Sequence, residues 1–123
     1  MLHFSRTLAL AAAAALVVAG SAHAQAKQNF NLTNDTGYVI SEVYVSPTAV
    51  ADWQEDVLGQ DVLGDQENVD INFDRSETSC KWDIKVVYDD GESAEWDGFN
   101  LCTISDITLD YDRDTGKTWA TSE

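Results

Sequence analysis

The sequence predicts an all-β protein whose main domain is an antiparallel β-sandwich of about six to eight short strands. Three observations favour this fold. Beyond residue 24, apolar and polar residues alternate with a period of two, which is typical of half-buried strands. Turn sequences that contain glycine separate the alternating runs. Beyond residue 24, the segment from Thr48 to Asp56 is the one helix candidate, and it predicts a single short turn.

The most regular strands are expected in the second half of the chain. Apolar residues occupy alternate positions in residues 69–73, 80–88, 94–97 and 107–111. The sequences Asp89-Asp90-Gly91-Glu92 and Asp114-Thr115-Gly116-Lys117 predict hairpin turns, because glycine tolerates the positive φ that these turns require. The apolar positions change parity before Ile107, so we expect a bulge or a tight corner at Ser105-Asp106.

The first half of the domain is less regular. Residues 38–45 are apolar at both odd and even positions, which predicts a central strand, and residues 30–33 are expected to pair beside it. A five-residue echo follows, Asp56-Val57-Leu58-Gly59 and then Asp61-Val62-Leu63-Gly64. We interpret this echo as a loop whose Val57, Leu58, Val62 and Leu63 cap one end of the sandwich.

Residues 1–24 predict an export signal in helical form. Arg6 precedes an apolar stretch from Leu8 to Ala19, and Ala22-His23-Ala24 is a typical cleavage sequence. The apolar stretch is shorter than the ~20 residues that span a bilayer, so a retained membrane anchor is disfavoured. We expect cleavage after Ala24, delivery to the periplasm or the outside, and a single β-sandwich domain over residues 25–123.

Composition after residue 24 excludes several classes of function. Cleavage removes both histidines and one base, and the mature chain then holds 22 acids and six bases, a formal charge of −16. Nucleic acid and anionic membrane surfaces are therefore poor partners. Without histidine the mature chain has neither the commonest general base nor the commonest metal ligand. We expect a monomer of one domain with a thin core.

Cys80 and Cys102 are the only two cysteines in the chain. In an oxidising compartment such a pair predicts a disulfide rather than a metal site or redox chemistry. Zinc, haem and iron–sulfur sites then lack ligands. No glycine-rich loop leads into a helix, so a phosphate site has no support. We therefore expect no cofactor, with calcium as the one candidate.

Two acidic groups are candidate calcium sites. Asp110, Asp112 and Asp114 have the spacing of an oxygen-ligand loop, but glycine comes one position late and Thr121 stands where a bidentate Glu is required. A strand that runs into a hairpin produces the same spacing without a metal. The second group, in and before the echo, would surround a cation or a basic group of a partner; its members are Asp52, Glu55, Asp56 and Asp61, with Trp53 beside them as a contact.

The mature chain contains four tryptophans, which is many for its length. Trp82 and Trp96 lie in the inward register of their predicted strands, so we expect both in the core. Trp53 lies in the irregular segment and Trp119 near the end of the chain. Exposed aromatic side chains mark recognition surfaces, so Trp53 and Trp119 are the candidate recognition residues.

Several blocks of the chain carry a resemblance: Thr36-Gly37-Tyr38-Val39-Ile40, Cys80-Lys81-Trp82-Asp83-Ile84 and Gly98-Phe99-Asn100-Leu101-Cys102. With them, residues 30–111 resemble an uncharacterised family of short exported proteobacterial β-domain proteins. The resemblance implies export and a β-domain, and it implies no site residues. Some members carry the name argininosuccinate lyase. This sequence contradicts that name, because it lacks the enzyme's Gly-Ser-Ser-x-Met-Pro loop and its long helices.

We therefore expect a non-enzymatic, exported, acidic β-sandwich that binds a protein or a small ligand in the periplasm or envelope. One alternative is a structural or stress-related domain that its acidity keeps soluble. The other is a small hydrolase that uses carboxylates, but nothing in the sequence selects a catalytic pair from 22 acids.

Overall fold

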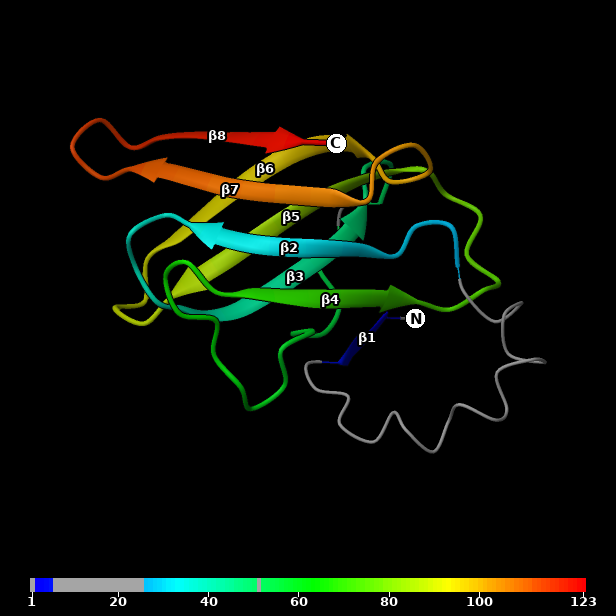
Figure 1. Cartoon of the computed structure of the whole chain (residues 1–123), viewed down its shortest axis with the longest axis horizontal. Helices are drawn as coiled ribbons and strands as arrows, with labels where there is room; N and C mark the ends of the chain where they lie inside the picture. The colour runs from blue at the N-terminus through cyan, green and yellow to red at the C-terminus, as the bar shows by residue number, and fades with distance from the viewer. Residues whose placement is uncertain (1, 6–25, 51) are drawn as a thin grey trace.

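The computed structural model describes residues 2–5, 26–50 and 52–123, and these residues form eight strands in two sheets (Figure 1). The strands are β1 (Leu2–Ser5), β2 (Phe30–Asp35), β3 (Ile40–Pro47), β4 (Asn68–Phe73), β5 (Lys81–Tyr88), β6 (Ser93–Asn100), β7 (Asp106–Asp112) and β8 (Lys117–Ser122). The predicted all-β sandwich is confirmed. The described part of the chain contains no helix, and hence none that could cross a membrane.

The larger sheet has the strand order β1-β4-β2-β7-β8. Most of its pairs are antiparallel, as expected, but β2 and β7 run parallel, with Leu32 opposite Ile107. A period of two describes which side chains are buried and not which way a strand runs, so the sequence pattern did not predict this pair. The parallel pair places residues that follow β2 and β7 at the same end of the sandwich.

The smaller sheet has the order β3-β5-β6, and this order corrects two expectations. β3 is an edge strand rather than a central one, and residues 30–33 pair with β4 and β7 rather than with β3. A register shift between Ile40 and Glu42 explains the apolar residues at odd and even positions. Because the extra residue changes the parity, Ile40, Val43 and Val45 all point into the core.

The loop that contains the echo covers the free edge of β3. Val57 N–H donates to Val43 O at 2.8 Å, and Ile40 and Leu63 exchange two backbone hydrogen bonds of 2.9 Å. Val57, Leu58 and Leu63 are buried as predicted, whereas Val62 is 49% exposed. The loop thus satisfies backbone groups that an edge strand would otherwise leave unpaired.

The helical turn predicted from Thr48 to Asp56 is not present in the described residues of that segment. A turn follows β3 instead, in which Val50 N–H donates to Pro47 O at 2.9 Å. The Ser46 hydroxyl lies within hydrogen-bonding distance of the carbonyl oxygens of Val50 and Asp52, at 3.2 and 3.0 Å. The hydroxyl has one proton, so it donates to one of these carbonyl groups at a time, in place of a backbone N–H that a helix would provide.

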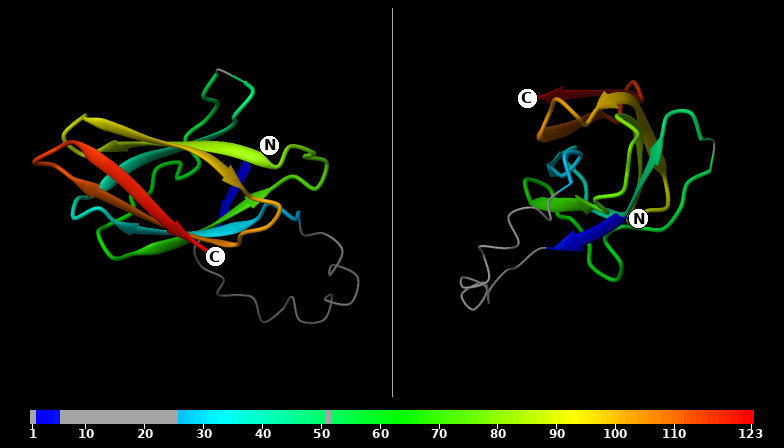
Figure 2. Two further views of the ribbon diagram at one scale, coloured as in Figure 1. Left: turned by 90° about the horizontal axis from the view of Figure 1, so that it is seen from above. Right: turned by 90° about the vertical axis from the view of Figure 1, so that its right-hand side faces the viewer.

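The core lies between the two sheets, which face one another in the views of Figure 2. It includes Trp82 and Trp96, which are 2% and 5% exposed, as their inward register predicted. On one side β6 contacts β8, and the Trp96 Nε1–H donates to Trp119 O at 2.8 Å. This hydrogen bond joins the two sheets at that side of the sandwich.

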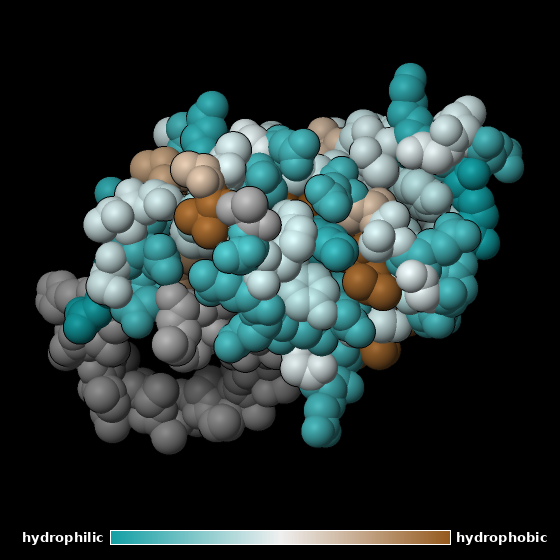
Figure 3. Space-filling model, turned by 180° about the vertical axis from the view of Figure 1, so that it is seen from behind, coloured by the Kyte–Doolittle hydropathy of each residue, from teal (hydrophilic) through white to brown (hydrophobic). Residues whose placement is uncertain are grey.

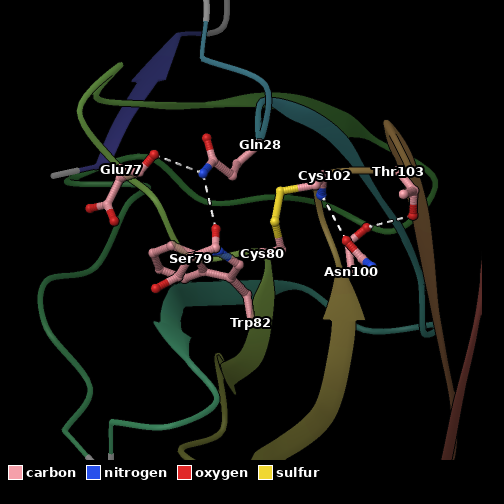
Figure 4. Close-up of a disulfide and its surroundings, with 8 residues drawn as sticks. All are labelled: Gln28, Glu77, Ser79, Cys80, Trp82, Asn100, Cys102 and Thr103. Atoms are coloured by element: carbon pink, nitrogen blue, oxygen red, sulfur yellow. Dashed lines mark hydrogen bonds between the residues drawn. A yellow bond between two sulfur atoms is a disulfide. The ribbon is translucent and has the colours of Figure 1, made fainter.

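Cys80 and Cys102 form the predicted disulfide, with their Cα atoms 5.1 Å apart (Figure 4). Beside it, the side-chain amide of Gln28 donates to the carbonyl oxygens of Glu77 and Ser79 at 3.1 and 3.0 Å, and Gln28 is fully buried. The Trp82 indole also donates to Ser79 O, at 2.9 Å. These contacts join the segments before β2, before β5 and after β6. We call this end of the molecule the disulfide end.

Residues 2–5 belong to the predicted signal helix, but the structure places them in strand β1. β1 pairs antiparallel with β4, with Leu2 opposite Phe73 and Ser5 opposite Asp70. An edge strand presents unpaired N–H and C=O groups, and an extended segment can satisfy them where a helix cannot. The apolar stretch and the cleavage sequence of the predicted signal lie outside the described residues.

Candidate functional site

Three tyrosines pack together at the end of the sandwich opposite to the disulfide. Tyr38 precedes β3, Tyr88 ends β5 and Tyr111 lies near the end of β7. The rings of Tyr88 and Tyr111 are stacked with centroids 5.3 Å apart, and Tyr38 contacts both rings edge-on at 6.0 and 6.2 Å. The chain directions of β5 and β7 bring these residues to one end, which we call the aromatic end.

Arg113 lies over this cluster. Its guanidinium carbon is 4.2 Å from the centroid of the Tyr38 ring, and its Nη2 donates to Asp90 Oδ2 at 2.6 Å. The pKa of Asp90 lies below its usual range, chiefly because its side chain accepts a hydrogen bond from the Glu92 backbone N–H, with Arg113 as a further cause. A planar cation is thus placed between an aromatic face and an ionised carboxylate.

A groove of about 360 Å³ opens at the aromatic end. Its lining combines three aromatic rings, of which Tyr38 and Tyr111 are half-buried, with charges of both signs: Thr36, Gly37, Tyr38, Tyr111, Asp112, Arg113, Asp114 and Trp119. Trp119 is 47% exposed there. Gly37 has a φ of +88° and open space where a Cβ would stand, and its N–H donates to Asp65 Oδ1 at 2.8 Å. The groove therefore offers ring faces, carboxylates and an accessible backbone.

Two further hollows among the described residues lack this combination of features. One of about 280 Å³ is polar and has Asn29, Asn31 and Asp70 in its lining. One of about 430 Å³ lies at the disulfide end, between Pro47, Ala49 and Cys80. On the face shown in Figure 3, apolar residues are scattered among hydrophilic ones rather than joined in one patch. The groove at the aromatic end is therefore the candidate site.

The hydroxyl group of Tyr88 is buried beneath the groove. It makes no hydrogen bond of good geometry among the described residues, although the Thr36 side chain is close enough to offset part of the rise in its pKa, and Tyr88 as a whole is 1% exposed. Burial raises the pKa of Tyr88 to about 12, because the phenolate would lose its hydration. A buried hydroxyl without a well-formed hydrogen bond costs stability, and Gln28 Oε1 at the disulfide end is in the same position.

A carboxyl pair lies on the outer face of the larger sheet. Asp35 and Asp110 are opposite each other in β2 and β7, and Trp119 is the partner of Asp110 in β8. The pKa of Asp110 is raised to about 6, first by partial burial and then by the hydrogen bond and the negative charge of Asp35. The Gln66 amide also donates to Asp35. The pair lies outside the lining of the groove, on an open sheet face, so it gives the hydrolase alternative no support.

The structure separates most of the candidate calcium ligands. Asp110 is engaged with Asp35, whereas Asp112 accepts a hydrogen bond from the Asp114 backbone N–H at 3.0 Å. Asp56 uses Oδ1 to accept from Val43 N–H and Leu58 N–H at 2.9 and 3.0 Å. No group of three or more potential ligands converges within the described residues, and Asp52, Glu55 and Asp61 stand in exposed loop positions. Calcium stays a prediction, which melting curves with millimolar calcium, and magnesium as a screening control, would test.

The two candidate recognition tryptophans do not form one surface. Trp119 lies on β8 and lines the groove. Trp53 is half-buried in the segment between β3 and the echo loop, and that loop covers the free edge of the smaller sheet. Because β6 and not β3 contacts β8, these edges are on opposite sides of the sandwich. Only Trp119 belongs to the candidate site.

Sequence reasoning missed Tyr38, Tyr88, Tyr111 and Arg113 as site residues. A usable signal was present for Tyr88, which directly precedes the predicted turn at Asp89-Asp90-Gly91-Glu92. What brings the three rings together is the parallel pairing of β2 with β7 and the packing of the two sheets, and neither follows from alternation.

Comparisons with known proteins support the fold. No protein-family model and no curated protein match the chain. A solved structure, the NMR structure of a protein from Eubacterium rectale, is similar with a TM-score of 0.56 and 14% sequence identity, over 84% of this chain and 91% of the other. At that identity the likeness extends to the fold alone. The resemblance to the exported proteobacterial family stays a prediction.

Proposed function

We propose that this protein is an exported, non-enzymatic, monomeric binding module of the periplasm or envelope, and that it binds its partner in the groove at the aromatic end. The observation that carries this proposal is the composition of the groove, in which exposed Trp119 and the Tyr38 face stand beside charges of both signs. Exposed aromatic side chains are costly to leave in water and are enriched at binding surfaces.

Two features support export. The N-terminal sequence has the charged, apolar and small-residue parts of a secretion signal. The disulfide is compatible with an oxidising compartment. Fractionation of a proteobacterial host that expresses the full chain, followed by mass spectrometry of the protein, tests this part. We expect a periplasmic product that begins at Gln25 and contains the disulfide. An intact chain in the cytoplasm would contradict export.

The binding part is tested by cross-linking capture from envelope extracts with the exported protein. We expect Trp119→Ala to reduce capture of a discrete partner and Trp53→Ala to leave it unchanged, because only Trp119 lines the groove. Both variants lose a tryptophan side chain, so Trp53→Ala controls for a general change in non-specific hydrophobic binding. Equal capture by both variants, or no saturable partner, would favour the structural or stress-related alternative.

A further inference from the structure

We infer that the groove at the aromatic end binds the guanidinium group of an arginine in a basic partner segment, which takes the place of the protein's own Arg113. This inference rests on the proposed binding function and specifies its ligand. The partner would be a protein or peptide with an exposed arginine. In the absence of that partner, the Arg113 side chain occupies the position that the partner's arginine would take.

The position of Arg113 shows what the site accepts. Its guanidinium lies 4.2 Å from the Tyr38 ring centroid while its Nη2 donates to Asp90 at 2.6 Å. A guanidinium group is planar and weakly hydrated, so it can stack on an aromatic face and direct its N–H groups to a carboxylate in the same plane. A lysine ammonium has no plane to stack, and an anion would meet the carboxylates.

Arg113 is held weakly enough to be displaced. The side chains of Arg113 and Asp90 are 42% and 40% exposed, and Arg113 belongs to the turn between β7 and β8. Exposed ion pairs and exposed cation–π contacts each stabilise a protein only weakly, because water competes for both groups. The Tyr38 ring, in contrast, is fixed by edge contacts with Tyr88 and Tyr111. The aromatic face therefore persists when Arg113 swings away.

The surrounding charge favours a second cation. The two hairpin segments at this end, residues 88–93 and 111–118, contain five carboxylates but only two bases, Arg113 and Lys117. Asp112 and Asp114 line the groove itself. An incoming guanidinium thus enters a field with an excess of negative charge, and the mature chain's formal charge of −16 attracts a basic segment over longer distances.

The first experiment titrates ¹⁵N-labelled exported protein with tetra-arginine, tetra-lysine and tetra-citrulline peptides at equal ionic strength. Chemical shifts of the Gly37 amide and the Trp119 indole report on the groove. We expect saturable shifts with tetra-arginine, binding weaker by roughly two- to five-fold with tetra-lysine, and none with uncharged citrulline. Equal affinity for arginine and lysine peptides would overturn the inference in favour of unspecific charge attraction.

The second experiment compares Arg113→Gln with Arg75→Gln. Both variants lose one guanidinium, but Arg75 lies in the turn after β4, at the disulfide end of the sandwich. Loss of Arg113 exposes the Tyr38 face and frees Asp90, so we expect tetra-arginine to bind roughly two- to five-fold more tightly to Arg113→Gln than to Arg75→Gln. Equal or weaker binding to Arg113→Gln would overturn the inference.

Tyr38→Leu removes the stacking face, and Tyr44→Leu, in the smaller sheet, is its matched control. We expect only Tyr38→Leu to weaken tetra-arginine binding, by roughly two- to five-fold, with NMR dispersion confirming that each variant is folded. If Tyr38→Leu does not fold, the Arg113 comparison decides. If the arginine peptide fails to bind while envelope capture still depends on Trp119, the inference is wrong and the proposed binding function stands.

Discussion

The two ends of this sandwich are held together in different ways. At the disulfide end, a covalent bond and the fully buried amide of Gln28 join three segments. At the aromatic end, stacked rings and an exposed ion pair do so. Each end also contains a buried polar atom without a hydrogen-bond partner among the described residues, Gln28 Oε1 at the disulfide end and the Tyr88 hydroxyl at the aromatic end. Stability is concentrated at the disulfide end, and the aromatic end keeps groups available for a ligand. Substitutions should therefore separate stability from binding.

The largest expected effect is loss of the disulfide. The double substitution of Cys80→Ser and Cys102→Ser opens a loop with a sequence separation of 22, for which chain entropy predicts a loss of about 3 kcal/mol in unfolding free energy. For a domain of this size, calorimetry should show a Tm lower by more than about 10 °C. Binding of tetra-arginine below the new Tm should be unchanged. A Tm close to that of the wild type would contradict the comparison.

The next effect concerns the buried amide at the same end. Gln28→Met keeps the size of the side chain and removes its hydrogen bonds to the carbonyl oxygens of Glu77 and Ser79. Ser79 O still accepts from the Trp82 indole, and the unpartnered Gln28 Oε1 is lost as well. We expect the unfolding free energy to fall by about 1 kcal/mol in chemical denaturation. Gln60→Met, at an exposed position, is the control and should have little effect. Similar losses in both variants would show that the Gln28 hydrogen bonds contribute nothing specific.

A smaller effect, and one that depends on pH, is expected near the aromatic end. The pKa of Asp110 is about 6 in the folded protein, so the protonated form stabilises the fold. That stability is present below about pH 4 and is lost as the pH rises through 6. Asp110→Asn should remove this dependence and raise the unfolding free energy at pH 7 by less than about 1 kcal/mol.

Melting curves between pH 4 and 7 measure the effect of Asp110→Asn. Asp106→Asn removes an exposed acid from the same strand and serves as the control. Identical pH profiles for the two variants would show that proximity to Asp35 is not the cause.

The smallest effect is expected for Tyr88→Phe. The hydroxyl has no partner among the described residues, so its removal should leave the unfolding free energy at pH 7 unchanged or slightly higher. Tyr88 in the unfolded chain ionises near pH 10, but in the folded protein its pKa is about 12. Wild-type stability should therefore fall as the pH rises from 10 to 12, and the fall should be smaller in Tyr88→Phe. Marked destabilisation at pH 7 would mean that the hydroxyl is hydrogen-bonded.

Alternation of residue types by itself determined much of this protein. The inward positions of Trp82, Trp96 and Ile107, the glycine turns of two hairpins and the cysteine pair all follow from local sequence, because burial and turn conformation depend on neighbouring residues. Local sequence also identified Trp119 as a candidate recognition residue. The structure confirms these predictions of fold and disulfide.

Only the tertiary structure decided the order and direction of the strands, and with them the candidate site. Alternation of apolar and polar residues does not indicate which strands pair with each other. The edge position of β3 and the parallel pairing of β2 with β7 were therefore not predictable from it. That pairing and the packing of the sheets bring Tyr38, Tyr88 and Tyr111 together, and Arg113 beside Asp90. These residues are far apart in the sequence, and their contacts depend on long-range packing rather than on any local preference.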